Sequence, residues 1–144
     1  MAALRELYLG IDTSAYTTSL CLVDRDGSTA AEARQVLEVP EGKQGLRQSE
    51  ALFQHVQNLP KVAEKLRGQL SGEWKVAAAA ASSQPRPYAD SYMPVFSAGR
   101  SFGETYAQLT GIPFYELSHQ ENHILSGLHT AGGPTSERFF SIHL

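Results

Sequence analysis

Two histidines at the start of a predicted helix are the residues of this sequence best suited to metal chemistry. His119 and His123 stand four apart in the segment HQENH. Side chains at i and i+4 share one helix face, so two neutral imidazoles can bind one metal ion if further ligands come from elsewhere. A solvated helix start with two incidental histidines fits the same spacing. Glu121 lies at i+2, so the HExxH pattern of zinc proteases is absent.

A second candidate site lies where the first predicted strand ends, at Asp12, Thr13 and Ser14. Small residues at a strand end can expose backbone amides and hydroxyls to a phosphate. The Asp12 carboxylate is suited to hold a metal-bound water or a hydroxyl, which makes Asp12 the candidate catalytic residue. A strand end capped by polar turn residues is an equally good interpretation of the local pattern.

The periodicity of apolar residues predicts the elements that carry these side chains. β-rich runs predict strands over 7–11 and 18–23 and a third run ending at Val36, joined as a meander. Apolar positions three and four apart predict a helix capped by Ser49, with a kink or interruption at Pro60. His55 lies beside the apolar face of this helix and is expected to pack rather than to bind a ligand.

Strands and helices alternate in the second half of the chain. Its pattern predicts a buried strand over 74–81, a loop over 84–94, a helix over 100–109 and a short strand over 114–117. Ser118 is expected to cap a helix that runs to about residue 128. The apolar run 138–144 predicts one more strand and suggests that the chain is cut at a domain boundary.

The predicted order is βββ-α-β-α-β-α, which indicates the α/β class. Three antiparallel strands followed by strands with crossover helices predict a mixed sheet with helices on its faces. This is the layout of a ribonuclease-H-like half-domain.

Composition bounds the class of protein. A chain of 144 residues with 42% hydrophobic and 19% charged residues and no long apolar run predicts one soluble, cytoplasmic domain with no membrane span. The single cysteine, Cys21, lies in an apolar run and predicts a buried, inert thiol. The net charge of −3 is spread evenly, so this half alone does not predict a nucleic-acid-binding surface.

Several motifs together resemble the tRNA threonylcarbamoyladenosine transferase family, long known as O-sialoglycoprotein endopeptidases or glycoproteases. The resemblance covers nearly the whole chain and corresponds to the first half of a family member. The matching positions, in order, are the segment LGIDTS at 9–14, Thr18-Ser19, His55 with Pro60, Gly99 with Gly103, Pro113, and His119-x-Glu121-x-His123.

The resemblance implies an actin/Hsp70-like pair of domains with a nucleotide and a divalent metal, iron or zinc, in the cleft between them. His119 and His123 would be the metal ligands, and Asp12, Thr13 and Ser14 would line the phosphate side of ATP or threonylcarbamoyl-adenylate. The substrate would be a tRNA adenosine. Residues 1–144 would form a single N-terminal actin-like subdomain, expected to bind metal weakly and to have no transferase activity without the C-terminal half.

Two departures from the family pattern keep other functions open. Residues 15–17 replace the usual acidic residues, and residues 83–88 replace a Gly-Pro-Gly-Leu loop. A diverged, non-catalytic paralogue or scaffold that pairs with a family member is therefore an alternative. A glycoprotein metallo-endopeptidase is disfavoured, because no nucleophile lies beside the histidines. Self-association through the helices that begin near Ser49 and Arg100 is also expected, giving a homodimer.

Overall fold

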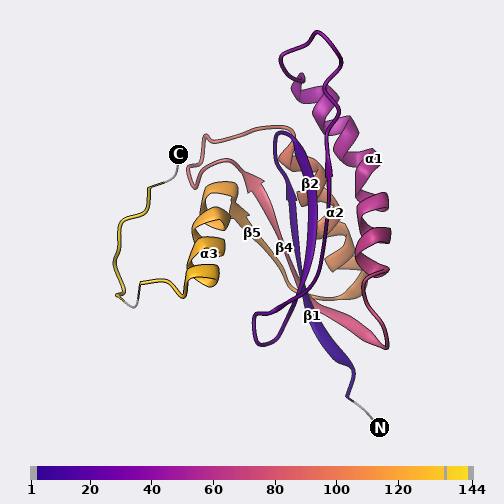
Figure 1. Cartoon of the computed structure of the whole chain (residues 1–144), viewed down its shortest axis with the longest axis vertical. Helices are drawn as coiled ribbons and strands as arrows, with labels where there is room; N and C mark the ends of the chain where they lie inside the picture. Colours follow the sequence, from indigo (N-terminus) through magenta and orange to yellow (C-terminus); the bar gives the residue numbers. More distant parts are fainter. Residues whose placement is uncertain (1–2, 135, 143–144) are drawn as a thin grey trace.

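The computed structural model describes residues 3–134 and 136–142. Three strands come first and are followed by helices alternating with strands (Figure 1). The elements are β1 (Arg5–Thr13), β2 (Thr17–Asp24), β3 (Thr29–Val36), α1 (Gln48–Arg67), β4 (Trp74–Gln84), α2 (Phe96–Thr110), β5 (Phe114–Ser118) and α3 (His119–Ala131).

The strands form one five-stranded mixed sheet in the order β3-β2-β1-β4-β5. Strands β1, β2 and β3 pair antiparallel, whereas β4 is parallel to both β1 and β5. The crossover from β3 to β4 runs through α1, and the crossover from β4 to β5 runs through α2. The predicted element order and the ribonuclease-H-like layout are therefore confirmed.

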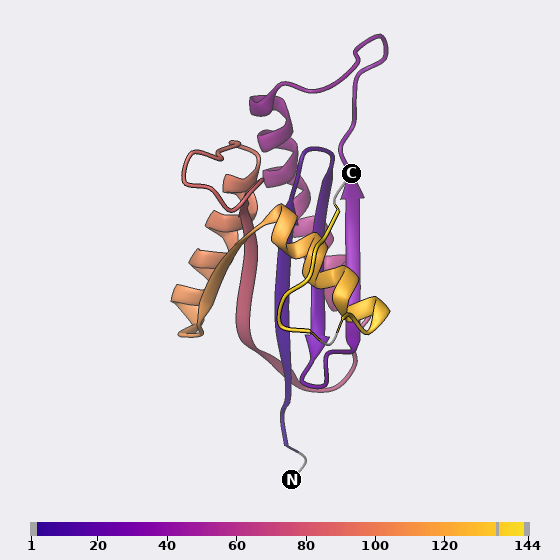
Figure 2. The same cartoon turned by 90° about the vertical axis from the view of Figure 1, so that its left-hand side faces the viewer.

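Helices α1 and α2 cover one face of the sheet, and α3 crosses the other face (Figures 1 and 2). Strand β1 alternates accordingly, because successive side chains of a strand point to opposite faces. Leu7, Leu9 and Ile11 are buried in the main core with residues of α1 and α2, while Gly10 and Asp12 lie on the α3 side and are partly accessible. The alternation thus separates a packing face from a face that stays available for chemistry.

Glycines let α2 approach the sheet closely. A Cβ atom at Gly103 would lie 2.7 Å from Ile11 Cδ1 and 2.8 Å from Phe114 Cε2. A Cβ atom at Gly99 would lie 3.0 Å from both Ile11 Cγ2 and Thr13 Oγ1. The glycine pair that carried part of the family resemblance therefore has a packing role.

Three details of the predicted helices differ from the structure. Helix α1 begins at Gln48 with Arg47 at the N-cap, so Ser49 lies inside the helix and does not cap it. Helix α1 runs without interruption through Pro60, whose exposed position leaves water free to bind the carbonyl that lacks its helical partner. Helix α2 begins at Phe96 rather than near Arg100, because Val95 and Phe96 are buried against Leu37 and Ala51 although no side chain caps the helix.

The last predicted strand is also absent from the described residues. Residues 136–142 form no strand, and residues 143–144 of the predicted run lie outside the described part of the chain. No helix within the described ranges is long and apolar enough to cross a membrane.

We predict that Gly103→Ala lowers the free energy of unfolding by about 1–2 kcal/mol, because overpacking against Ile11 and Phe114 outweighs the better helix propensity of alanine. Gly127→Ala in α3 is the matched control, since no atom lies within 4 Å of the Cβ position there. Urea denaturation of both variants checks the prediction. A Gly103→Ala protein as stable as the Gly127→Ala protein would contradict it.

Candidate functional site

The carboxylate of Asp12, near the end of β1, is the centre of a polar network. Its Oδ1 atom accepts a hydrogen bond from the Ser14 amide at 2.9 Å. Its Oδ2 atom accepts one from Ser82 Oγ at 2.5 Å and one from His119 Nδ1 at 2.8 Å. Because β1 and β4 are parallel neighbours and β5 leads directly into α3, these side chains meet at the carboxyl ends of the parallel strands.

His119 and His123 lie on one face of α3, as predicted, with their Nε2 atoms 2.8 Å apart. A carboxylate only accepts hydrogen bonds, so Nδ1 of His119 carries a proton, and in the neutral form of the ring Nε2 presents a lone pair. Asp12 therefore fixes both the orientation and the tautomer of His119.

Helix α3 has no buried residue, and polar contacts join its first turns to the sheet. Ser118 is the N-cap: its hydroxyl accepts from the Glu121 amide at 3.1 Å, and the Glu121 carboxylate accepts from the Ser118 amide at 2.7 Å. Asn122 donates to Ser82 Oγ at 2.7 Å. The hydroxyl of Ser82 thus links α3 to Asp12.

The structure does not bring the Thr13 side chain into this site. Thr13 is fully buried on the other face of β1, where its hydroxyl donates to the Val95 carbonyl at 2.9 Å and accepts from the Gly99 amide at 3.0 Å. Ser14 takes part through its backbone, because its amide bonds Asp12 and its carbonyl accepts a hydrogen bond from His55.

His55 is a structural part of the site that the sequence pattern did not reveal. It is 0% exposed, with Nε2 2.6 Å from the Ser14 carbonyl and Nδ1 2.8 Å from Thr18 Oγ1. Since a carbonyl only accepts, Nε2 carries the proton, and Nδ1 of the neutral ring accepts from Thr18. His55 therefore ties α1 to the turn that follows Asp12. Its expected packing role is confirmed, but its partners depend on tertiary contacts.

The electrostatics of the network follow from these bonds. Burial tends to raise the pKa of Asp12, but the hydrogen bonds from His119 and Ser82 and the charge of His119 outweigh it, so the pKa lies below its ordinary value. The pKa of His119 is raised, first by its hydrogen bond to Asp12, against the opposing effect of burial. Asp12 is thus held as a carboxylate that favours a proton on His119.

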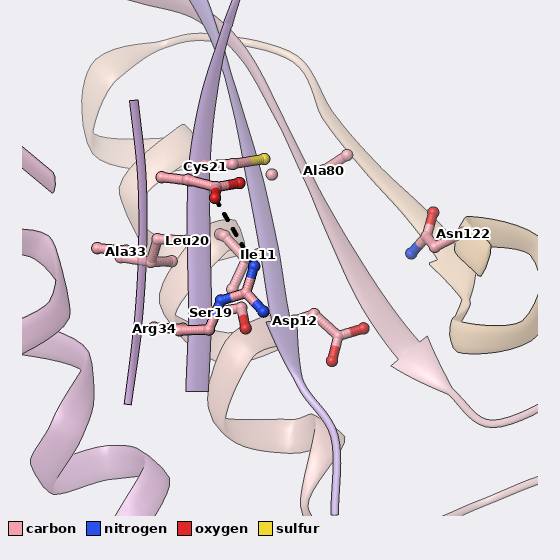
Figure 3. Close-up of a pocket in the computed structure, with 11 residues that line it drawn as sticks. Ile11, Asp12, Ser19, Leu20, Cys21, Ala33, Arg34, Ala80 and Asn122 are labelled. Carbon is pink, nitrogen blue, oxygen red and sulfur yellow. Dashed lines mark ion pairs between the residues drawn. The ribbon is translucent and has the colours of Figure 1, made fainter. Parts of the chain in front are cut away.

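A pocket of about 280 Å³ opens beside Asp12 on the α3 side of the sheet (Figure 3). Strands β1, β2, β3 and β4 form its floor, and Asn122 of α3 borders it. Cys21 lines this pocket and is half-buried rather than fully buried as expected, and desolvation by burial raises the pKa of its thiol. The pocket joins the Asp12 network to the open sheet face.

The two histidines fit a divalent metal ion as a pair of ligands. Imidazole nitrogens suit zinc and iron, and a carboxylate bonded to the second ring nitrogen is the usual outer partner of a metal-binding histidine. Among the described residues, no group of three histidine, cysteine, aspartate or glutamate side chains is placed to hold an ion. This part of the chain therefore offers two ligands, and further ligands would have to come from outside it.

We predict that His55→Ala lowers the free energy of unfolding at pH 7.5 by about 2–4 kcal/mol, because it leaves a cavity and unpaired polar partners. Burial lowers the pKa of His55, so the unfolded chain takes up a proton near pH 6.5 before the native protein does. Wild-type stability therefore falls as the pH falls through this range, and the difference from His55→Ala shrinks.

Urea titrations at several pH values measure this difference. Gln57→Ala, at an exposed position of the same helix, is the control and should change stability by less than about 0.5 kcal/mol at any pH. A wild-type to His55→Ala difference that stays constant from pH 7.5 to about pH 5 would show that the native ring takes up its proton normally.

Comparison with known proteins identifies the fold. No family model matches the sequence, and no curated protein matches it. YeaZ from Pseudomonas aeruginosa is similar in structure, with a TM-score of 0.61 and 15% identity, over 88% of this chain and 50% of that chain. An uncharacterized protein with similarity to peptidase YeaZ from Pseudomonas aeruginosa gives a TM-score of 0.58 and 16% identity over the same shares. The chain thus spans about half the length of these structures and has the fold that the motif resemblance implied.

Proposed function

We propose that this chain is the metal-binding N-terminal domain of a threonylcarbamoyl transferase that modifies tRNA adenosine. One observation carries the proposal: the His119 and His123 Nε2 atoms converge to 2.8 Å while Asp12 holds the opposite nitrogen of His119. The fold shared with YeaZ is the fold that the motif resemblance implies, in keeping with this function. Fold alone does not fix an activity, so the proposal depends on His119, His123 and Asp12.

Each residue of the network has a role in this proposal. His119 and His123 would hold a divalent metal ion, iron or zinc, which supplies Lewis-acid polarisation and positioning of the activated carbonyl group when it is bound. Asp12 keeps Nδ1 of His119 protonated and so leaves Nε2 available. Ser82 of β4 donates to the Asp12 carboxylate, and Asn122 of α3 holds Ser82 by donating to its hydroxyl oxygen.

The segment from Asp12 to Ser14 is proposed to face the phosphate side of ATP or threonylcarbamoyl-adenylate. Two of its groups are committed elsewhere, since the Thr13 hydroxyl bonds α2 and the Ser14 amide bonds Asp12. Hydrogen-bond donors from other parts of the protein must therefore complete the phosphate site. We expect no transfer to tRNA by this domain alone, because catalysis by positioning is lost when half of a cleft is missing.

A peptidase is less consistent with the geometry. Ser82 is the hydroxyl residue bonded to Asp12, but it is fully buried and donates its proton to that carboxylate. A nucleophile needs an accessible oxygen and a base that accepts its proton. Ser82 therefore serves to position Asp12 rather than to attack a substrate.

An apolar surface on α1 and α2 supports a second role, pairing with a family paralogue or a second copy of this chain. An apolar groove lies between α1 and α2, on the side away from α3. Its lining includes Val56 and Pro60 of α1 and Phe102 of α2, and the neighbouring Phe53 is 63% exposed. Exposed apolar surface of this kind is typical of a docking surface. The two roles are compatible, because the groove and the histidines lie on different faces of the sheet.

We predict weak binding of Zn²⁺ or Fe²⁺ to the protein, lost on His119→Ala or His123→Ala and weakened about 10- to 100-fold by Asp12→Asn, which removes the partner that orients His119. Isothermal titration calorimetry and equilibrium dialysis measure the affinities. His129→Ala, further along the same helix, is the matched control. Equal metal affinity in the His119→Ala and His129→Ala proteins would rule out this metal site.

We also predict that the protein forms a dimer at tens of micromolar, measured by analytical ultracentrifugation. Val56→Asp should weaken the dimer by at least about tenfold, because a carboxylate would be buried without a partner in the groove. Leu109→Asp, on α2 but outside the groove, controls for the loss of an exposed apolar side chain. A monomeric wild-type protein, or equal effects of the two variants, would count against pairing through this groove.

A further inference from the structure

Strand register aligns two rows of side chains across the open face of the sheet. Asp12 pairs with Ser19, and Ser19 pairs with Arg34, so these three residues form one row across β1, β2 and β3. Neighbouring strands are about 4.8 Å apart, which places the backbones of Asp12 and Arg34 about 10 Å from each other. All three residues line the pocket beside the histidine site (Figure 3).

The second row places small side chains at the bottom of the pocket. Glu32, Cys21 and Gly10 are in register across β3, β2 and β1, and Gly10 pairs with Ala80 of β4. A Cβ atom at Gly10 would come within 2.8 Å of Cys21 Sγ. The floor therefore consists of small residues, with charged side chains at the β3 end and Asn122 at the α3 end.

Arg34 is the cationic group of this pocket that remains available for a ligand. Its guanidinium lies 3.8 Å from the Glu32 carboxylate, and both side chains are about two-thirds exposed, at 68% and 64%. That distance is too long for a direct hydrogen bond, so the pair is loose. The Asp12 carboxylate, in contrast, is already occupied by Ser14, Ser82 and His119.

We propose that this pocket binds the amino-acid part of the transferred group, with its carboxylate on Arg34 and its N–H and hydroxyl donors directed to Glu32 and Ser19. The inference rests on the proposed function, since that function supplies a group with a carboxylate at one end and an activated carbonyl at the other. The pocket extends from Arg34 to Asp12, so a ligand bound there points its other end toward His119.

Charge selects this class of ligand over a phosphate. Arg34 supplies one positive charge beside the Glu32 carboxylate, so a phosphate dianion at this end of the pocket would be repelled by Glu32 and only partly neutralised by Arg34. A monoanion that also carries hydrogen-bond donors satisfies Arg34 and Glu32 together. The volume of about 280 Å³ is at the small end for ligand sites and suits such a compound.

The probe for this pocket is N-carbamoyl-L-threonine, which carries the carboxylate, the hydroxyl and the carbamoyl group but no nucleotide. We expect the protein to bind this compound, and changes in the amide NMR chemical shifts of the pocket residues measure the binding. Arg34→Gln should weaken binding at least about fivefold, because a charge-assisted hydrogen bond is lost at a partly exposed site. Arg25→Gln, in the exposed turn between β2 and β3, should bind as the wild type does.

The methyl ester of the same compound lacks the anionic group and should bind at least about fivefold more weakly to the wild type, with no further loss in Arg34→Gln. Equal affinity for acid and ester, unchanged affinity in Arg34→Gln, or no binding by the wild type would each overturn the proposal. Adenosine monophosphate and inorganic phosphate test the rival anion, and tighter binding of either at Arg34 would also overturn it.

Failure of the pocket and failure of the transferase function give different results. Metal binding that depends on His119, without Arg34-dependent binding of the carbamoyl compound, would reject the pocket and leave the transferase function standing. Arg34-dependent binding without any metal affinity at His119 and His123 would support an amino-acid-derived ligand and reject the metal site.

Discussion

Three hydrogen bonds converge on the carboxylate of Asp12, and the placement of α3 depends on them. The donors come from the turn after β1, from β4 and from α3 itself. No residue of α3 is buried, and none belongs to the apolar core that α1 and α2 share with the sheet. Polar contacts at its N-terminal end therefore determine where the two histidines lie. Removing the Asp12 carboxylate would affect the position of the helix as well as the chemistry of one ring.

The alternation of β1 explains how one strand serves both core and site. Ile11 and Thr13 point toward α2, and Thr13 bonds that helix through its hydroxyl. Asp12, between them, points toward α3. A shift of one residue in the register of β1 would bury the carboxylate among apolar side chains, at a large cost in free energy. The tight packing of Ile11 against Gly103 thus also fixes the position of Asp12.

Local signals in the sequence were sufficient for the histidine pair and for the order of elements. The spacing of His119 and His123 and the capping box begun by Ser118 depend on neighbours within one helical turn, so they could be predicted. The partners of His55, by contrast, lie 37 and 41 residues away in sequence. The side of β1 on which Thr13 lies, and the burial that starts α2 at Phe96, depend on tertiary packing in the same way.

His55 lies between the proposed metal site and the proposed docking groove. Its ring lies on the inner side of α1, whereas Val56, the next residue, lines the apolar groove on the outer side. From the ring, hydrogen bonds lead to the Ser14 carbonyl, from the Ser14 amide to Asp12, and from Asp12 to His119. A partner in the groove and a ligand at the histidines would therefore act on opposite ends of one chain of bonded groups. Coupling between them requires that this chain have two arrangements. The full burial of His55 and its bonds at both ring nitrogens favour a single arrangement, so the network is better suited to hold the site rigid than to transmit a signal.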